Sequence, residues 1–184
     1  DVNVGLPEID EAKLMDMAVR ELQAVCELPL QIDSSDAVVL ERAMRLYNGK
    51  PLVNSVNGKQ ESMAQIFPLV KKYGGVLIAL TIDENGIPDS AQARFAIAQK
   101  ILRCAEEYGI AKKDIIVDPL ALTVSSDSAA PQVTMESIKR LSAAGFRTSL
   151  GVSNISFGLP ARDVLNAAFF SGALYAGLDC AIMN

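Results

Sequence analysis

The sequence contains no histidine and no tryptophan, and only three of its 184 residues are cysteines. Without histidine, the chain cannot form a Ser-His-Asp triad, an HExxH zinc site or any imidazole acid–base pair. Cys26, Cys104 and Cys180 are far apart and form no CxxC motif. We therefore expect no metal site and predict free, buried thiols in a reducing cytoplasm. Chemistry must then come from carboxylates, amides or a borrowed cofactor.

Long hydrophobic runs and an excess of positive charge are also missing. Polar residues interrupt every apolar stretch before it reaches the roughly 20 residues that a membrane-spanning helix needs. A formal net charge of −5 argues against nucleic acid as the main partner. Half of the residues are hydrophobic, which is enough to build a sizeable core. We predict a single domain over residues 1–184 that has neither a nucleic-acid partner nor a membrane partner.

Short β-branched runs alternate with longer segments whose apolar residues recur at helical spacing. Residues 11–26, for example, place Leu14, Met17, Leu22 and Val25 on one side of a helix. Such alternation predicts right-handed crossovers and a parallel sheet. The predicted strands are residues 1–5, 29–33, 51–57, 76–82, 114–119, 148–154 and 180–184.

Polar residues at the strand ends distinguish a closed barrel from an open, doubly wound sheet. Only the strands at the switch point of an open sheet need polar ends, whereas a barrel draws its site from almost all of its strands. Nearly every predicted strand here ends in a polar group, which favours a TIM-type (β/α)8 barrel. Seven strands are one short of eight, and the chain opens and ends inside strands. We therefore expect a fragment that lacks its first strand and leaves an open seam between two unpaired edges.

Two aspartates and an asparagine stand at the ends of early and middle strands. Asp33 precedes residues 34–36, which are equally typical of a helix N-cap. Asn54 would lie inside the mouth of the barrel, where a buried amide needs partners. Asp118 ends an otherwise apolar strand, and a carboxyl group there must be solvated, paired or bound to a ligand.

The segment 150–160 is the most informative motif. Gly151 allows a close approach to the backbone, and Ser153 with Asn154 places two uncharged hydrogen-bonding groups at the strand end. Carboxylates and amides without metal spacing suit a flat heterocycle with alternating donors and acceptors. A pterin is such a ring, because an aspartate can accept two hydrogen bonds from its aminopyrimidinone edge.

In order along the chain, the motifs resemble those of the pterin-binding methyltransferase family. This family includes the methyltetrahydrofolate:corrinoid protein methyltransferases and the folate module of cobalamin-dependent methionine synthase, and dihydropteroate synthase is a more distant relative with the same barrel. The resemblance covers essentially the whole chain. Its motifs lie at residues 1–5, 32–34, 53–57, 79–88, 117–120, 151–160, 165–170 and 176–179.

The resemblance implies a role for each of eight site residues. Asp33, Asn54 and Asp118 are expected to bind the edge of the pterin. The strand that contains Gly151, Ser153 and Asn154 is expected to run beside N5 of the pterin ring. Arg162 is expected to lie against the aminobenzoate and Ile182 to form a wall of the pocket. Phe157 departs from relatives that carry a polar residue there.

The implied reaction moves the N5-methyl group of methyltetrahydrofolate to the cobalt of a cobalamin (corrinoid). Asn154 would be the catalytic residue, because its amide could accept a hydrogen bond from protonated N5. The corrinoid would arrive on a partner protein or domain that docks over the barrel mouth, and a homodimer is compatible with this interpretation. The final methyl acceptor stays open.

Two other functions remain as alternatives. A dihydropteroate synthase-like enzyme should carry basic residues at its late strands, whereas residues 153–154 and 183–184 are neutral. A non-catalytic folate-binding module would bind methyltetrahydrofolate without transferring its methyl group. A sugar or aldol-type barrel is less favoured, because no lysine or histidine stands at a strand end.

Overall fold

The computed structural model describes residues 1–183 and contains alternating strands and helices throughout. This confirms the predicted α/β class. The strands are β1 (Val2–Asn3), β2 (Gln31–Asp33), β3 (Leu52–Asn57), β4 (Val76–Leu80), β5 (Ile115–Asp118), β6 (Arg147–Gly151) and β7 (Cys180–Ile182). The helices are α1 (Glu11–Val25), α2 (Ala37–Leu46), α3 (Gln60–Tyr73), α4 (Ala91–Glu107), α5 (Ala130–Ala143) and α6 (Arg162–Ala176).

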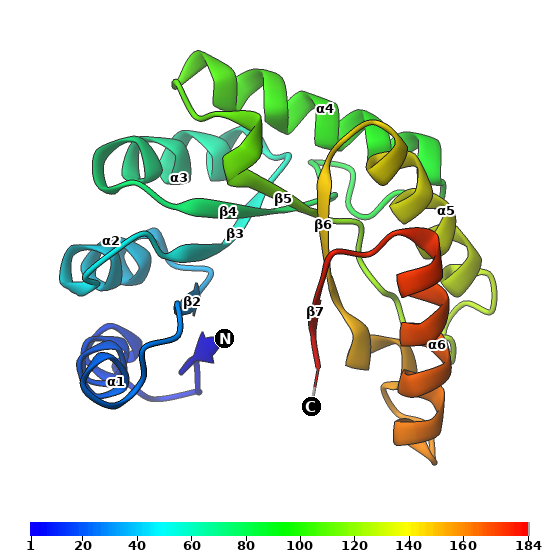
Figure 1. The fold of residues 1–184 in the computed structure, drawn as a ribbon, viewed down its shortest axis with the longest axis horizontal. Helices are drawn as coiled ribbons and strands as arrows, with labels where there is room; N and C mark the ends of the chain where they lie inside the picture. The colour runs from blue at the N-terminus through cyan, green and yellow to red at the C-terminus, as the bar shows by residue number, and fades with distance from the viewer. Residues whose placement is uncertain (184) are drawn as a thin grey trace.

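The strands form one curled sheet in which neighbours in sequence are neighbours in space. Their order is β1 to β7 without rearrangement, and every pairing is parallel. Figure 1 shows the sheet curving so that β1 and β7 face each other across an opening, with the helices outside. Within residues 1–183, β1 and β7 each pair with a single neighbour. The described chain is thus a half-barrel of seven strands.

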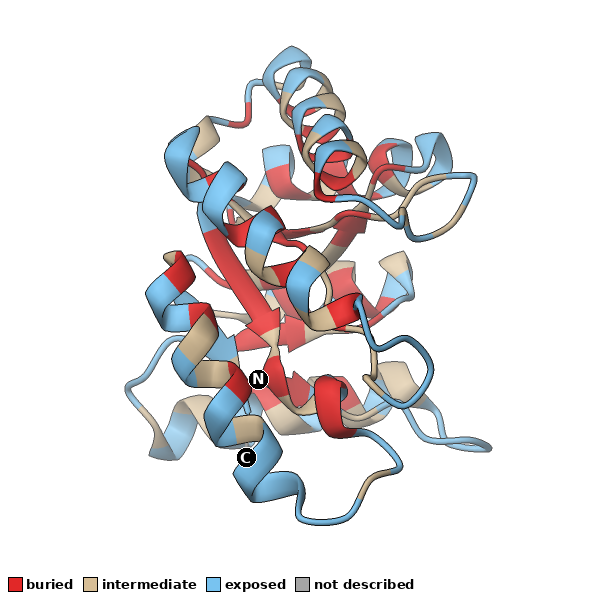
Figure 2. Cartoon of the chain, turned by 90° about the vertical axis from the view of Figure 1, so that its right-hand side faces the viewer, coloured by how far each residue is buried: buried red, intermediate tan, exposed pale blue. Residues whose placement is uncertain are grey.

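The core lies between the convex face of the sheet and the helices. Ile32, Val53, Leu77 and Ile115, which face the helices from successive strands, are each at most 1% exposed. Figure 2 shows the buried strands enclosed by helices whose outer faces are exposed. Burial of this apolar face supplies the main stabilisation of the half-barrel, at about 25 cal/mol per Å².

Local sequence signals fix where several helices begin. The carboxylate of Asp10 accepts a hydrogen bond from the Lys13 N–H, and that of Asp36 accepts one from the Val38 N–H. Both are N-cap contacts, which satisfy backbone donors that a first helical turn leaves free. Asp36 therefore belongs to the helix cap, as one of the two interpretations of residues 34–36 predicted.

Several expectations about detail were wrong. In α1 the buried side chains are Met15 and Val19, whereas Met17 and Val25, which were expected on its apolar side, are exposed. The sixth strand ends at Gly151 rather than at residue 154, because the chain turns there into a 3₁₀ helix, Val152–Ser156. The three cysteines are free but are not fully buried: Cys26 and Cys104 are half-buried and Cys180 is exposed. Desolvation raises the pKa of the Cys104 and Cys180 thiols, so neither is an activated thiolate. The predicted strand position at residue 184 lies outside the described residues.

Among residues 1–183, no helix combines the length and the apolar character that crossing a bilayer requires.

Two positions on α2 test the assignment of the core. Leu40 is fully buried whereas Val38 is 63% exposed. We expect Leu40→Ala to lower the free energy of unfolding by about 2 to 5 kcal/mol, because it removes buried methyl groups and leaves a cavity. Val38→Ala, on the same helix, should change it by at most about 0.5 kcal/mol. Urea denaturation of both variants would measure this, and equal effects would contradict the assignment.

Candidate functional site at the carboxyl ends of the strands

A cavity of about 370 Å³ opens at the carboxyl ends of the strands, on the concave side of the sheet. Seven of the eight residues singled out in the sequence line it: Asp33, Asn54, Asp118, Gly151, Ser153, Asn154 and Ile182. Arg162 does not. The remaining lining residues are Asp1, Leu80, Leu120 and Met183. Two hollows of about 410 and 580 Å³ lie elsewhere and contain none of these side chains.

The register of the sheet explains why residues so distant in sequence meet. Asp33 pairs with Asn54, Leu80 with Asp118 and Gly151 with Ile182. Paired residues of neighbouring parallel strands share a face and a level. Five of the six occupy the last position of a strand, and Asn54, in the middle of β3, shares the level of Asp33, so the curled sheet carries all six to one mouth.

Asp118 is the deepest ionisable group of the site. Its side chain is buried, and its Oδ1 accepts a hydrogen bond from the Leu120 N–H at 2.7 Å. Burial raises the pKa of Asp118 to about 6, although the N–H groups of Leu120 and Gly151 and the charge of Arg94 act in the opposite direction. The carboxylate is therefore ionised at pH 7.5 but takes up a proton in mildly acidic solution.

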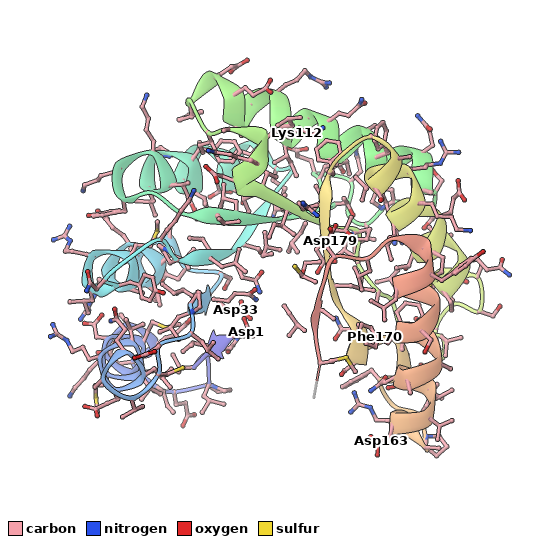
Figure 3. The ribbon with its side chains drawn as sticks, in the orientation of Figure 1. Asp1, Asp33, Lys112, Asp163, Phe170 and Asp179 are labelled. Atoms are coloured by element: carbon pink, nitrogen blue, oxygen red, sulfur yellow. The ribbon has the colours of Figure 1, made fainter. Side chains whose placement is uncertain are left out.

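Two further acids, Asp1 and Asp33, lie on the opposite side of the cavity. Asn3 donates a hydrogen bond from Nδ2 to Asp33 Oδ2 at 3.0 Å, and Gln31 donates one from Nε2 to Asp1 Oδ1 at 2.6 Å. Figure 3 shows Asp1 and Asp33 together on the concave side, across from β7. The amides of Asn3 and Gln31 thus fix the orientation of two carboxylates at the mouth.

Gly151 and Asn154 form a close pair. A Cβ atom on Gly151 would lie 2.9 Å from Nδ2 of Asn154, which is too close for a real side-chain contact. The absence of a side chain at Gly151 therefore makes room for the amide of Asn154 over the end of β6. The group that approaches the backbone at Gly151, as the sequence led us to expect, is thus the side-chain amide of Asn154.

Arg162 holds the 3₁₀ helix from behind. Its Nη2 donates to the carbonyl of Ser153 at 3.0 Å and its Nε to Ser156 Oγ at 3.1 Å. The neighbouring Phe157 has an exposed side chain, and its carbonyl accepts a hydrogen bond from Thr123 Oγ1 at 2.9 Å. Arg162 thus supports a lining residue and stands outside the cavity lining.

Some contributors to the site were not singled out from the sequence. Asp1 lines the cavity and Asn3 bonds to the lining residue Asp33, and their two-residue spacing was the available signal that both lie on one face of the sheet. Leu120 gave no signal, because its place in the lining follows from a left-handed backbone conformation, with φ of 69°. Arg94 did give one: it interrupts the apolar side of α4 between Ala91 and Ala98.

The family profile described as "Pterin binding enzyme" matches residues 5–184. A methylcorrinoid:tetrahydrofolate methyltransferase from Eubacterium limosum is 32% identical over 190 aligned residues, which cover 100% of this chain and 69% of that protein. The chain therefore belongs to the pterin binding enzyme family, and the resemblance recognised in the sequence is confirmed.

Two further comparisons define how far the similarity extends. A methionine synthase from Mycobacterium tuberculosis is 34% identical over 171 residues, or 85% of this chain, which spans only 14% of that protein. A solved dihydropteroate synthase from Yersinia pestis, with a pterine–sulfa conjugate, superposes with a TM-score of 0.77. The superposition covers 97% of this chain and 71% of the synthase at 19% identity, so it shows a shared fold.

The raised pKa of Asp118 predicts an unusual dependence of stability on pH. Its folded pKa of about 6 lies above the value of about 3.9 in an unfolded chain. The folded state therefore holds this proton more tightly, and the contribution to stability is present below pH 4 and lost as the pH rises through 6. We expect Asp118→Asn to be more stable than the wild type at pH 8 by up to about 3 kcal/mol.

That difference should shrink towards zero at pH 4, where both side chains are neutral. Denaturant unfolding at pH 4, 6 and 8 measures it, and the difference between variant and wild type cancels the titration of the other carboxylates. A constant difference across this range would show that Asp118 is not desolvated in the folded state.

Proposed function

We propose that the cavity binds methyltetrahydrofolate and that the protein transfers its N5-methyl group to the cobalt of a corrinoid held by a partner protein or domain. The observation that carries the proposal is the lining of the cavity. It combines the acids Asp1, Asp33 and Asp118 with the amides Asn54 and Asn154, and within the described residues it includes no lysine or arginine. The names of the Eubacterium limosum and Mycobacterium tuberculosis relatives support the same chemistry.

The acids suit the edge of a pterin. Asp118 Oδ1 is already bonded to the Leu120 N–H, yet a carboxylate retains further acceptor sites. An ionised Asp118 can therefore accept hydrogen bonds from the ring N–H and the exocyclic amine of the aminopyrimidinone. Asp33 and Asn54, which are register partners on β2 and β3, supply an acceptor and an amide from the other side. Ile182 and Leu80 would enclose the ring between them.

The end of β6 suits the reacting part of the substrate. N5 is a poor leaving group as a tertiary amine, so it must carry a proton or a strong hydrogen bond when its bond to the methyl carbon breaks. The Asn154 amide, held over Gly151, is our candidate for that partner. A corrinoid supplies the nucleophilic cobalt when its carrier is docked. The Eubacterium limosum relative is named for the opposite direction of transfer, which requires the same groups around N5.

Ser153 and Arg162 complete the proposed substrate contacts. Ser153 lines the cavity, and its carbonyl is bound by Arg162. Because Arg162 lies at the start of α6 and outside the cavity lining, we propose that it reaches only the aminobenzoate part of the folate. Its second role is to hold Ser153 in place.

A dihydropteroate synthase-like activity is less well supported. A pyrophosphate-bearing substrate needs positive charge, whereas the ionisable residues in the described lining are all acids. A folate-binding module without catalysis would keep the same cavity, and only the methyl-transfer assay below distinguishes it.

We further infer that the half-barrel forms part of an eight-stranded barrel. The inference rests on the two strand edges that each have one described neighbour and on β7, whose Cys180 and Ala181 are both exposed. Strands of parallel sheets are normally covered on both faces. The missing cover would come from residues or a chain outside the described part.

The three free thiols agree with a reducing, cytoplasmic location.

Replacing the charge of Asp118 tests pterin binding. We expect Asp118→Asn to weaken methyltetrahydrofolate binding by about 10- to 100-fold at pH 7.5, because hydrogen bonds to a charged group contribute about 1.5 to 3 kcal/mol. Wild-type affinity should fall as the pH drops through 6, where Asp118 takes up a proton.

Calorimetric titration measures both effects. Asp114→Asn is the matched control, since Asp114 precedes the same strand at its other end and pairs with Lys50. If Asp118→Asn binds methyltetrahydrofolate as tightly as the wild type does, the Asp118 carboxyl has a purely structural role.

Truncating Asn154 separates catalysis from binding. If its amide stabilises charge on N5 in the transition state, Asn154→Ala should slow methyl transfer to cob(I)alamin by about 10- to 1,000-fold. Methyltetrahydrofolate affinity should fall much less, because neutral N5 is a weak partner in the ground state.

A single-turnover assay on the full-length protein, following the loss of the cob(I)alamin spectrum, gives the rate. An unchanged rate would remove Asn154 from the mechanism. Wild-type binding without any transfer would select the non-catalytic alternative.

A further inference from the structure

Arg94 is a buried cation directly behind the candidate site. It belongs to the first turn of α4 and is only 1% exposed, on the same buried side of the helix as Ala91, Ala98 and Ile101. Removing a guanidinium from water costs several kcal/mol unless its donors are satisfied. A charge in this position therefore needs partners, and the identity of those partners indicates its role.

The described hydrogen bonds of Arg94 all go to backbone carbonyls. Nη1 donates to Pro119 O at 2.7 Å and to Leu120 O at 2.9 Å, and Nε donates to Pro88 O at 2.9 Å. One guanidinium thus ties the loop after β4 to the turn after β5. That turn begins at Asp118.

The turn sets the direction of the Asp118 carboxylate. Leu120 has a left-handed backbone, with φ of 69°, and its N–H donates to Asp118 Oδ1 at 2.7 Å. Such a conformation costs a non-glycine residue about 1 kcal/mol or more, so the surroundings must hold it. Arg94 and Thr134 both do so, because each donates a hydrogen bond to Leu120 O. Leu120 itself also lines the cavity.

Arg94 is also the cation whose field reaches Asp118. The ionisable residues in the described lining are all acids, Asp1, Asp33 and Asp118, while Asp89 and Asp127 act on Arg94 itself. Burial raises the pKa of Asp118, and the positive charge of Arg94 is among the influences that lower it. Without Arg94, the buried carboxylate would lose the positive charge that acts on it.

We propose that Arg94 is a positioning residue for ligand recognition: it holds the turn at residues 118–120 so that the Asp118 carboxylate faces the cavity, and it supplies the buried positive charge that balances this carboxylate. The part of the proposal that concerns the ligand rests on the proposed pterin function of the cavity. The part that concerns Asp118 does not, and it can be tested in the unliganded protein.

Two substitutions of Arg94 separate charge from geometry. Arg94→Met keeps a long apolar stem but removes the charge and all donors, whereas Arg94→Lys keeps the charge and loses the planar fork. The matched control is Lys100→Met on the same helix, because Lys100 Nζ also donates to a loop carbonyl, that of Gly58, at 2.6 Å. None of the described hydrogen bonds of Lys100 reaches the 118–120 turn.

The first measurement is the titration of Asp118, followed by its ¹³C carboxyl signal in the full-length protein without ligand. We expect Arg94→Met to raise the midpoint by about one pH unit or more, which is typical of losing a nearby opposite charge. Arg94→Lys should raise it less, and Lys100→Met should leave it unchanged. An unaltered midpoint in both Arg94 variants would overturn the proposal.

The second measurement is calorimetric binding of 5-methyltetrahydrofolate at pH 6.5 and pH 9. Arg94→Met should weaken binding by about 10-fold or more at pH 6.5, with partial recovery at pH 9 as Asp118 ionises. A brace with no part in recognition would give a loss that does not depend on pH. Wild-type protein that binds no methyltetrahydrofolate would refute the proposed function, while the titration would still decide the role of Arg94.

A further pair of variants applies if Arg94→Met does not fold. Arg94→Lys and Thr134→Val each remove hydrogen bonds to the Leu120 carbonyl without removing the charge. Both should weaken 5-methyltetrahydrofolate binding and shift the Leu120 amide signal. Wild-type values in both variants would overturn the proposal.

Discussion

The carboxylate of Asp118 is withdrawn from water at the end of β5, and the loops around it are arranged to offset the cost of that burial. An isolated ion in such a place would simply protonate. Here the Leu120 N–H, the Gly151 N–H and the field of Arg94 favour the charged form, while burial still raises the pKa to about 6. The group therefore remains ionised at neutral pH but is only partly satisfied, which is the condition of a side chain that gains from binding a hydrogen-bond donor.

The same half-barrel divides its residues between stability and function. Residues facing the helices, such as Ile32 and Val53, are fully buried and apolar, whereas their neighbours Asp33 and Asn54 face the cavity. Strand geometry imposes this alternation. Because a cavity residue contributes little to the core, its chemistry can change without loss of the fold. The low identity shared with dihydropteroate synthase at a TM-score of 0.77 is consistent with this separation.

The sequence was sufficient to predict the strand order and the meeting of most lining residues, because a polar residue at the end of an apolar run is visible without coordinates. It was not sufficient for features that depend on three-dimensional contacts. The 3₁₀ helix that carries Asn154 places its amide close to Gly151, a contact between residues that strand propensity does not register, and strand propensity alone extended β6 too far. Arg94 was visible as a charge on an apolar helix side, but its carbonyl partners come from two separate loops, one of them 25 residues along the chain.

The excess of acids at the mouth has a consequence for the proposed chemistry. Asp1, Asp33 and Asp118 all line the cavity, and the nearest buried cation, Arg94, lies behind the Asp118 turn. A field of this sign opposes phosphorylated ligands and favours positive charge on a bound heterocycle. In the proposed transfer, N5 must carry a proton or a strong hydrogen bond when its bond to the methyl carbon breaks, and the acids would raise the basicity of N5. The acids of the cavity would then stabilise a proton on N5, and the Asn154 amide would accept a hydrogen bond from it. These two contributions differ in kind. The carboxylates act over distance, on both ground and transition states, whereas the amide acts only where its oxygen meets the N–H bond.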